Sequence, residues 1–395
     1  MQGPAAMTSA TVPPISSLCL EDGSLGSGST VRADVAAEWL VGLPKQLIDI
    51  DRIYLEPGVE AYRRGQEILA RFPDAERIQV DSHWKIPTLH GNEGSAEDWL
   101  KIKRSVLVLG VKKTLGLRPN GRSAHFIAPS SSNGCAMACA YCYVPRRKGY
   151  ANPISLFVNI EENCRAIARH AERQGRLSVP DQIDPHLWVY DIGENGDLSV
   201  DAALCDNVKD LVTLFRQVPN AKGSFATKFV NPDLLGYDPQ NKTRVRFSLM
   251  PEEIAKVVDV RTSPMGERIA AVDEFVRAGY EVHLNFSPVI MHEGWEEAYR
   301  RLFQQVDDCL SAEAKAQLKA EIIFLTHNAQ LHQVNMQWHP RAEEHLWRPD
   351  LQETKRSEGG MLNLRYKASW KRQWLARFQD LLARQLPYCR VRYAF

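Results

Sequence analysis

The stretch Cys135-Ala136-Met137-Ala138-Cys139-Ala140-Tyr141-Cys142-Tyr143 places three thiols in one short loop, at the spacing CxxxCxxC. The loop starts after Gly134 and follows an apolar run at residues 124–129. Thiolates this close repel one another and oxidise unless a metal ion or an iron–sulfur cluster holds them. The pattern therefore predicts that the three cysteines are metal ligands.

An iron–sulfur cluster is the first interpretation of this triad. On a [4Fe–4S] cluster three protein thiolates leave one iron open, and that iron can bind S-adenosylmethionine and pass one electron to it. A structural zinc site is the alternative, but such sites have four ligands and commonly use CxxC pairs. The chain has no second CxxC pair, although His125 or Cys164 could complete a zinc site.

The composition permits a large folded core. With 395 residues, of which 44% are hydrophobic, the chain can form one large domain or two, and its formal net charge is +1. Basic residues nevertheless flank the cysteines, which suits a polyanion, although solvated helix faces balanced by acids would give the same pattern. The flanking residues are Lys101, Lys103, Arg104, Lys112, Lys113, Arg118 and Arg122 before the loop, and Arg146, Arg147 and Lys148 after it.

The cysteine content and hydropathy bear on location. Eight cysteines without a recognisable signal peptide predict a reducing, cytoplasmic location. No apolar run reaches the roughly 18 residues of a membrane-spanning helix, so no membrane is expected among the partners. Residues 1–47 are rich in Gly, Ser, Ala and Pro without helical or strand periodicity, and they are predicted to be a disordered tail.

Residues 48–122 are predicted to form an N-terminal α/β lobe. A short strand near residues 53–55 precedes an amphipathic helix at 61–72, and further strands are expected at 77–80 and 105–111. The polar segment 83–98 is expected to be a loop.

Residues 123–330 alternate strands with helices, which predicts a parallel sheet with crossover helices. Six strands are too few for a closed eight-fold barrel, so the predicted fold is α/β, a partial (β/α)6 barrel with an open side for a large substrate. Residues 331–395 are predicted to be an extension packed on the barrel, with a basic helix at 370–382 and a closing strand at 389–395. The six strands are expected at residues 124–129, 186–192, 224–229, 244–249, 281–286 and 321–326.

Polar residues follow several of these strands. In barrels of this kind the active residues gather at the carboxyl ends of the strands, so these positions are candidates for the site. They are Asp191, Glu194 and Asn195 after the second strand, Lys228 after the third, Ser248 at the end of the fourth, and His327 and Asn328 after the sixth.

Longer blocks of sequence carry a family likeness. They are Tyr-Leu-Glu-Pro from Tyr54, Val-Leu-Gly-Val-Lys-Lys-Thr-Leu from Val108, Ala-Thr-Lys-Phe from Ala226, Thr-Arg-Val-Arg-Phe-Ser from Thr243, Thr-Ser-Pro-Met-Gly-Glu-Arg-Ile from Thr262, and His-Glu-Gly-Trp-Glu-Glu-Ala-Tyr from His292. The cysteine loop adds an aromatic residue, Tyr141, directly before its third cysteine. From about residue 53 to its end the chain thus resembles the spore photoproduct lyase family, radical S-adenosylmethionine enzymes that repair a thymine dimer in DNA.

The resemblance assigns roles to individual residues. It implies that Cys135, Cys139 and Cys142 hold a [4Fe–4S] cluster, and that Lys228 and Ser248 contact S-adenosylmethionine. Asn195, at the end of the second strand, is a further candidate for cofactor binding.

The resemblance also implies catalytic residues and partners. Tyr141 and Tyr143 match family tyrosines that relay the radical; without the resemblance both would be interpreted as packing residues. Lys228 would in that case be interpreted as the ion-pair partner of a barrel carboxylate such as Asp191. The implied partners are DNA with damaged thymines and an electron donor such as flavodoxin or ferredoxin.

The chain departs from the family at two strand ends. Just past the second strand the family has a cysteine that returns a hydrogen atom to the substrate, and Gly193 stands at that position in our alignment. Cys205 is the nearest later thiol, but it falls in a predicted helix. After the sixth strand His327-Asn328 replaces a His-Arg pair, which would weaken a phosphate contact.

Three functions follow as hypotheses. The first is radical repair of a thymine photoproduct, with the lesion exposed outside the base stack. The second keeps the radical chemistry but directs it at another nucleic acid or a small molecule, because the thiol donor is missing. The third is a nucleic-acid-binding protein whose cluster performs no radical chemistry.

Overall fold

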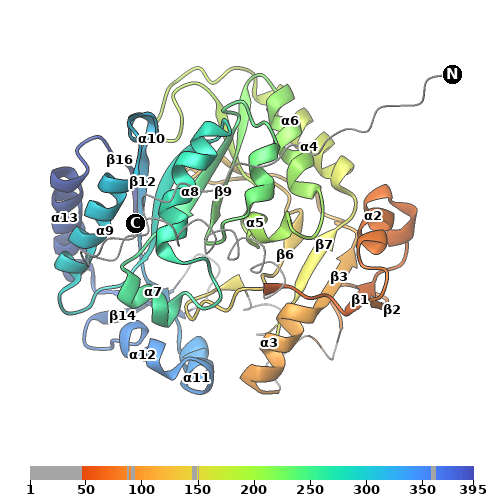
Figure 1. Ribbon diagram of the computed structural model, residues 1–395, viewed down its shortest axis with the longest axis horizontal. Coiled ribbons are helices and arrows are strands. Elements are labelled where there is room, and N and C mark those ends of the chain that lie inside the picture. Colours follow the sequence, from red (N-terminus) through yellow and green to blue (C-terminus); the bar gives the residue numbers. More distant parts are fainter. Residues whose placement is uncertain (1–46, 87–88, 90–93, 145–148, 150, 357–361) are drawn as a thin grey trace, which may run out of the picture.

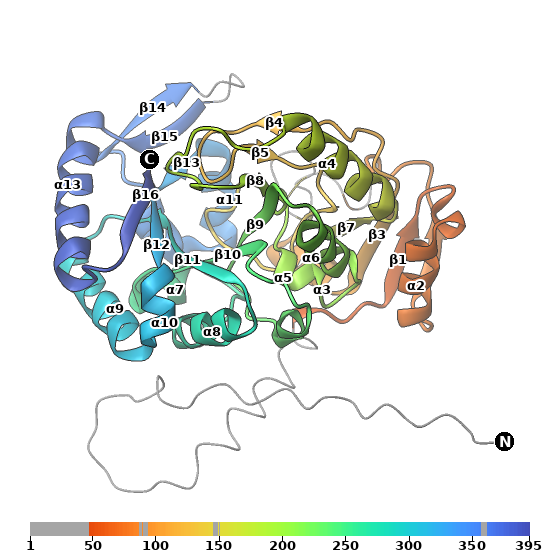
Figure 2. The ribbon, with the colours of Figure 1, turned by 90° about the horizontal axis from the view of Figure 1, so that it is seen from above.

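The computed structural model describes residues 47–395 apart from 87–88, 90–93, 145–148, 150 and 357–361. The predicted tail at 1–47 lies outside the described residues except for Leu47, and so do the basic residues Arg146, Arg147 and Lys148. The described chain forms a curled half-barrel with a lobe at one side (Figures 1 and 2). Within it, none of the helices combines the length and apolar character needed to cross a bilayer.

The lobe contains a five-stranded sheet in the order β2-β1-β3-β7-β6. Its central strand β3 is buried along its whole length, because Val, Leu and Gly occupy both faces. The predicted strands and the amphipathic helix of this lobe are confirmed. The elements are β1 (Arg52–Leu55), α2 (Arg63–Arg71), β2 (Glu76–Gln79), β3 (Val106–Gly110), β6 (Ser132–Asn133) and β7 (Ile154–Phe157).

Two strands of this sheet come from the part of the sequence expected to form the barrel. β7 pairs in parallel with β3, and β6 pairs antiparallel with β7. The cysteine loop therefore lies between a strand of the lobe sheet and the barrel, and the division of the sheets does not coincide with residue 122. The division of the chain into domains stays a prediction.

The lobe also contains a helix that was not predicted. α3 (Ala96–Ser105) begins inside the segment expected to be a loop, and a capping box marks its start. Ser95 Oγ accepts a hydrogen bond from the Asp98 backbone N–H (3.2 Å), and Asp98 Oδ2 accepts one from the Ser95 N–H (3.0 Å). The pair Ser95 and Asp98 was the signal that the sequence offered.

The barrel sheet has eight strands in the order β16-β12-β11-β10-β9-β8-β5-β4. The six predicted strands are confirmed, and each is parallel to its neighbour. β16 extends the sheet at one edge, parallel to β12, and β4 lies antiparallel to β5 at the other. The strands are β4 (Arg118–Pro119), β5 (Phe126–Ile127), β8 (Trp188–Asp191), β9 (Ala221–Thr227), β10 (Thr243–Ser248), β11 (Glu281–Val289), β12 (Lys319–Phe324) and β16 (Arg390–Ala394).

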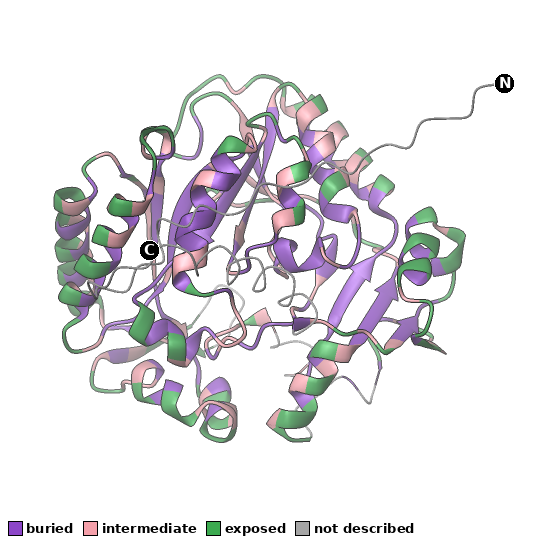
Figure 3. Ribbon diagram, viewed as in Figure 1, coloured by how far each residue is buried: buried purple, intermediate pink, exposed green. Residues whose placement is uncertain are grey.

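Helices cover the outer face of this sheet, and the main core lies between the two layers (Figures 1 and 3). Phe225, Phe247 and Phe275 are fully buried there. The covering helices are α4 (Ile160–Gln174), α5 (Leu198–Asp201), α6 (Asn207–Gln217), α7 (Glu252–Val258), α8 (Met265–Arg277), α9 (Trp295–Cys309) and α10 (Ala312–Gln317). Cys309, the last residue of α9, is disulfide-bonded, which the expected reducing location did not anticipate.

Within the described residues, the C-terminal part adds three helices, a small antiparallel sheet and the edge strand of the barrel. The predicted basic helix is α13 (Ala368–Gln385), which packs on α9 through the buried Phe378, and the predicted closing strand is β16. Unpredicted elements precede them: β13 (Thr326–His327), α11 (Ala329–Trp338), α12 (Pro340–Leu346), β14 (Gln352–Arg356) and β15 (Leu362–Tyr366). β13, β15 and β14 form a small antiparallel sheet.

Candidate active site

The cysteine loop is held by backbone hydrogen bonds at both ends. The Gly134 N–H donates to the Asn195 carbonyl at 2.9 Å, which ties the loop to the end of β8. The Ala138 and Ala140 N–H groups donate to the carbonyls of Val260 and Val258, at 3.1 and 2.9 Å. The loop conformation is thus fixed by main-chain contacts with two barrel segments.

Gly134 is required at the start of the loop. Its φ is +93°, a left-handed conformation that other residues rarely adopt. A Cβ at this position would lie 2.3 Å from the Pro153 carbonyl oxygen, which is far inside van der Waals contact. The glycine therefore lets the cysteine loop pass directly beside the segment leading into β7.

The three cysteines converge on one cavity. Cys135, Cys139 and Cys142 line it, and the other lining residues among those described are apolar or neutral except for Lys103. With thiols and no carboxylate in its lining, the cavity suits a soft, thiolate-bound iron cluster better than a hard oxygen-bound ion. The remaining lining residues are Met137, Ala138, Val144, Leu331, Asn335 and Trp338.

Burial makes bare thiolates costly in this cavity. It raises the pKa of Cys135 well above its usual range, where the Asp197 carboxylate adds to the shift and the Lys103 ammonium opposes it. It likewise raises the pKa of Cys139, again with a carboxylate, Asp259, adding to the shift. Thiols in such surroundings are inert until a metal takes the place of their protons, which fits a ligand role.

The zinc alternatives place no further ligand at this cavity. Both nitrogens of the buried His125 are engaged elsewhere: Nδ1 accepts from the Val189 N–H at 2.9 Å, and Nε2 lies 3.1 Å from Asp181. Cys164 lies in α4 and is not among the lining residues. Neither residue completes a four-ligand site with the three cysteines.

Lys103 is a site residue that sequence reasoning missed. It was counted with the basic flank, yet it is buried, and its Nζ donates to the carbonyls of Cys135 (3.0 Å) and Asn152 (3.4 Å). Burial lowers its pKa, and the neighbouring Cys135 opposes that shift. Lys103 therefore braces the loop and brings a positive charge to the cavity. The unpredicted helix α3 carries it there, so only the capping box could have pointed to it.

Lys228 lies near the cysteine loop, and its partners are Ser287 and Asp259 rather than Asp191. Asp191 pairs with Arg246 at 2.9 Å, whereas the Lys228 Nζ donates to the Ser287 carbonyl (2.8 Å) and lies 3.9 Å from Asp259. The same ammonium lies 5.4 Å from the centre of the Tyr141 ring. Lys228 is thus aimed toward the cysteine loop, and the pairing with Asp191 is wrong.

Asp259, which the sequence did not single out, joins these residues. It accepts a hydrogen bond from the Tyr141 hydroxyl, and it pairs with the buried Arg268 at 2.8 Å. Burial opposes its ionisation, but Lys228 and Arg268 together hold its pKa below the ordinary value. The result is a buried carboxylate, flanked by two cations, that faces the hydroxyl of Tyr141.

Ser248 ends β10 and Asn195 follows β8, the two strands on either side of β9. The Ser248 hydroxyl accepts from Asn285 Nδ2 at 3.3 Å, and its carbonyl accepts from Arg268 at 2.9 Å. Asn195 Nδ2 donates to Ser130 Oγ at 2.8 Å. These residues belong to the carboxyl ends of the strands, as predicted, and whether they touch a cofactor stays a prediction.

Tyr143 is exposed on the rim. Tyr143 is 53% exposed to solvent, and its hydroxyl donates a hydrogen bond to the Glu194 carbonyl at 2.9 Å. The Glu194 carboxylate in turn accepts two hydrogen bonds from Arg118, at 2.8 and 2.6 Å. Tyr143 therefore places a hydroxyl at the end of β8, where the family's hydrogen donor was expected.

The position matched to that donor does not face the rim. A Cβ at Gly193 would lie 2.9 Å from Phe225 Cβ and 3.6 Å from Leu198 Cγ, and both of these residues belong to the main core. Cys205 is fully buried in the apolar cluster of the lobe, and burial raises its pKa to about 12. Among the described residues, no cysteine stands at the end of β8.

A partial parallel barrel with a three-thiol loop at the carboxyl ends of its strands defines the class of the radical S-adenosylmethionine enzymes. Within that class, the chain belongs to the spore photoproduct lyase family, whose sequence model matches residues 49–395. Members of this family are radical S-adenosylmethionine lyases that repair a photoproduct in DNA.

Curated relatives and solved structures agree with this assignment. Spore photoproduct lyase of Bacillus subtilis (strain 168) is 30% identical over 69% of this chain and 77% of its own length. The enzyme of Geobacillus sp. (strain Y412MC61) is 24% identical over 86% and 97%. A solved spore photoproduct lyase mutant with bound AdoMet and dinucleoside spore photoproduct shares the fold at a TM-score of 0.79, with 22% identity over 88% of this chain and 99% of that one.

Proposed function

We propose that this chain uses S-adenosylmethionine and a [4Fe–4S] cluster to repair a thymine photoproduct in DNA. The convergence of Cys135, Cys139 and Cys142 on one cavity, in a chain that matches the family from residue 49 to 395, carries the proposal. A related structure that holds both AdoMet and dinucleoside spore photoproduct supports the choice of cofactor and substrate.

The cofactors supply the radical chemistry and this chain positions them. When bound, the cluster and S-adenosylmethionine supply a 5′-deoxyadenosyl radical that can remove a hydrogen atom from the substrate. The three cysteines would hold the cluster, while Lys228 offers an ammonium and Ser248 a hydroxyl to the polar groups of S-adenosylmethionine. Asn195 would add an amide just past the end of β8, on the other side of β9 from Ser248.

Tyr141 and Asp259 form a unit suited to moving a hydrogen atom. A tyrosine that gives up a hydrogen atom loses an electron and a proton, and the proton needs a nearby acceptor. Asp259 is ionised beside its two cations and already accepts the hydrogen bond from Tyr141. The carboxylate can therefore hold the proton while the tyrosine is oxidised, and return it afterwards.

Tyr143 is assigned the return of a hydrogen atom to the repaired base: its O–H bond breaks as the C–H bond of the base forms, and the phenoxyl radical left on Tyr143 would regain a hydrogen atom, by way of Tyr141, from the 5′-deoxyadenosine that received one from the substrate. The Tyr143 hydroxyl donates to the Glu194 carbonyl just past the end of β8, and the side chain is exposed, so a flipped base could reach it. No cysteine among the described residues competes for that place. Replacing Tyr143 by phenylalanine should therefore leave cofactor cleavage intact and lower the yield of intact thymine.

The proposal is tested by anaerobic turnover. Cluster-loaded protein is incubated with S-adenosylmethionine, a reductant and ultraviolet-treated spore-type DNA, and photoproduct and thymine are quantified. Loss of photoproduct with matching recovery of thymine, absent in Cys139→Ala, is the expected result. Flavodoxin and ferredoxin are proposed as reductants and are compared with a chemical one. Unchanged photoproduct beside abundant 5′-deoxyadenosine would exclude repair of this lesion.

A second candidate is the same chemistry on a different lesion or nucleic acid. The absence of a described thiol at the end of β8 favours it, because a different hydrogen donor suits a different product radical. Product analysis with other irradiated DNAs and with RNA separates the two candidates. Binding of DNA without any cleavage of S-adenosylmethionine would instead indicate a cluster protein without radical chemistry.

A further inference from the structure

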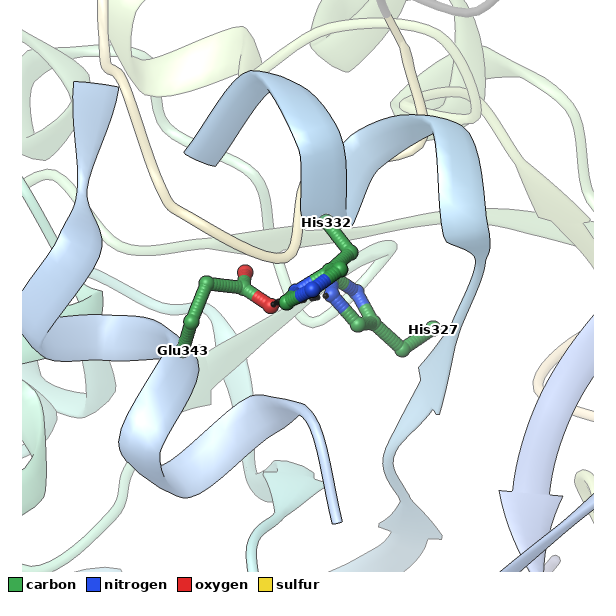
Figure 4. Close-up of side chains that lie close together, drawn as sticks. All are labelled: His327, His332 and Glu343. Carbon is green, nitrogen blue, oxygen red and sulfur yellow. Dashed lines mark hydrogen bonds and ion pairs between the residues drawn. The ribbon is translucent and has the colours of Figure 1, made fainter. Parts of the chain in front are cut away.

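Three side chains from three different elements meet beside the cysteine cavity. His327 comes from β13, His332 from α11 and Glu343 from α12, and they point toward one another (Figure 4). One ligand atom from each lies within 4.8 Å of the other two. Glu343 Oε2 is 3.1 Å from His327 Nε2 and 2.5 Å from His332 Nδ1.

The carboxylate at the centre of this cluster is buried and lacks a strong cation. Glu343 and His327 are almost fully buried, and within the described chain Glu343 forms no ion pair with any lysine or arginine. Burying a carboxylate is costly unless a positive charge compensates it. The groups that contact its Oε2 are ring nitrogens of two imidazoles, His327 Nε2 and His332 Nδ1. A bound metal ion would supply that charge.

The geometry is close to that of a metal site. Metal–ligand distances of about 2.0–2.2 Å in tetrahedral coordination put the ligand atoms about 3.4 Å apart. The separation between Glu343 and His327, 3.1 Å, is already near this value, and that between Glu343 and His332, 2.5 Å, must open by about 1 Å. His332 is partly exposed and stacks on Trp347 at 4.0 Å, so its ring can slide along the indole without leaving the site.

We propose that His327 Nε2, His332 Nδ1 and Glu343 Oε2 bind a divalent first-row transition-metal ion, separate from the cluster. Two imidazoles and one carboxylate are a ligand set for zinc or ferrous iron, and they leave a further coordination position open. Asn335 orients the carboxylate, because its Nδ2 donates to Glu343 Oε1 at 2.5 Å.

The ion would stabilise one wall of the cysteine cavity. Asn335 Nδ2 also donates to the Ala140 carbonyl at 2.6 Å, inside the cysteine loop. Leu331, Asn335 and Trp338 of α11 line the cavity, and Trp338 packs edge-on against Trp99 of α3 at 5.4 Å. A metal that joins β13, α11 and α12 thus holds α11 against the cluster loop.

The test uses the full chain with the cluster ligands removed. Cys135→Ala, Cys139→Ala and Cys142→Ala are combined so that the cysteine loop cannot bind the added metal, and zinc alone is titrated into protein first treated with a chelator. One equivalent of zinc should bind and raise the melting temperature. Cobalt in its place should give the intense visible bands of a four-coordinate site.

Matched substitutions locate the site. In the same background, His332→Ala and Glu343→Gln should each weaken zinc binding at least about tenfold, and Asn335→Ala should weaken it by about 10–100-fold. His345→Ala, on the same helix as Glu343 but outside the cluster, should bind zinc normally. His332 is the surface-most ligand, so its variant should fold and keep the readout interpretable.

Either of two results would overturn the site. The first is that the chain without Cys135, Cys139 and Cys142 binds no zinc and shows no shift in melting temperature, which would leave His327, His332 and Glu343 as a plain hydrogen-bond network. The second is that His332→Ala and Glu343→Gln bind zinc as well as their parent does. In both cases the proposed radical chemistry is untouched, because turnover is measured separately on the cluster-loaded wild type.

Discussion

A cysteine at position 193 tests whether the structure places the hydrogen donor correctly. The resemblance to the family matches Gly193 to the donor position, so it suggests Gly193→Cys as the substitution that would restore a donor. The structure predicts that it fails, because the new Cβ would lie 2.9 Å from Phe225 Cβ in the main core. Cβ is the side-chain atom nearest the backbone, so relief requires a shift of β9 itself rather than a rotamer change.

The cost can be worked out from this contact. Overpacking of a tight core costs about 1–3 kcal/mol, and loss of glycine entropy in the unfolded chain returns about 0.4–1 kcal/mol. We therefore expect Gly193→Cys to lower the free energy of unfolding by about 1–2 kcal/mol, as measured by urea unfolding. Its sulfur would point into the core, so repair yield should not rise.

Two controls complete the experiment. Gly193→Ala makes the same clash without a thiol, and its stability and yield should match those of Gly193→Cys. Glu194→Cys instead introduces a thiol one residue later. The Glu194 side chain is partly exposed, and its backbone carbonyl already accepts a hydrogen bond from Tyr143. If Gly193→Cys kept wild-type stability and raised the repair yield while Gly193→Ala did not, our interpretation of this strand end would be refuted.

Three further changes have defined outcomes. Lys228→Met removes the ammonium above the cysteine loop; loss of one charged hydrogen bond should weaken S-adenosylmethionine binding about 10–100-fold in equilibrium dialysis, with iron and sulfide content unchanged. Tyr143→Phe should lower the thymine recovered per 5′-deoxyadenosine formed, whereas Tyr388→Phe, which loses a comparable hydroxyl hydrogen bond to Asp307 (2.8 Å), should not. Burial lowers the pKa of His283 to about 3. Between about pH 6.5 and 3, His283 is therefore protonated in the unfolded chain but neutral in the folded chain. Stability should fall by about 1.4 kcal/mol per pH unit from this group as the pH decreases, and His283→Asn should flatten that slope in urea unfolding.

The alternation of strand and helix segments in the sequence was enough to predict the order of the barrel strands. Alternating strand and helix segments fix a parallel sheet, and the strand ends then bring Lys228, Ser248 and Asn195 to one rim without any further information. The closing strand β16 followed from the same reasoning. Apart from β16, which pairs with β12 from far along the chain, these features depend on pairing between barrel strands that follow one another in the sequence.

Features that depend on contacts distant in sequence could not be predicted this way. β7 follows the cysteines in the chain, yet it pairs with β3 of the lobe. Lys103 looked like a surface cation until α3 carried it to the cavity. The direction of a side chain at position 193 depends on Phe225, thirty-two residues away, and no periodicity reports it.

The central claim is that the three cysteines hold a cluster that cleaves S-adenosylmethionine, and one anaerobic measurement tests it directly. Wild-type protein and Cys139→Ala are purified without oxygen, analysed for iron, sulfide and zinc, and incubated with S-adenosylmethionine and reductant. We predict that the wild type contains iron and sulfide and forms 5′-deoxyadenosine, and that Cys139→Ala forms none. Zinc in place of iron at the cysteines of the wild type, or iron-loaded wild type that leaves S-adenosylmethionine intact, would contradict the account.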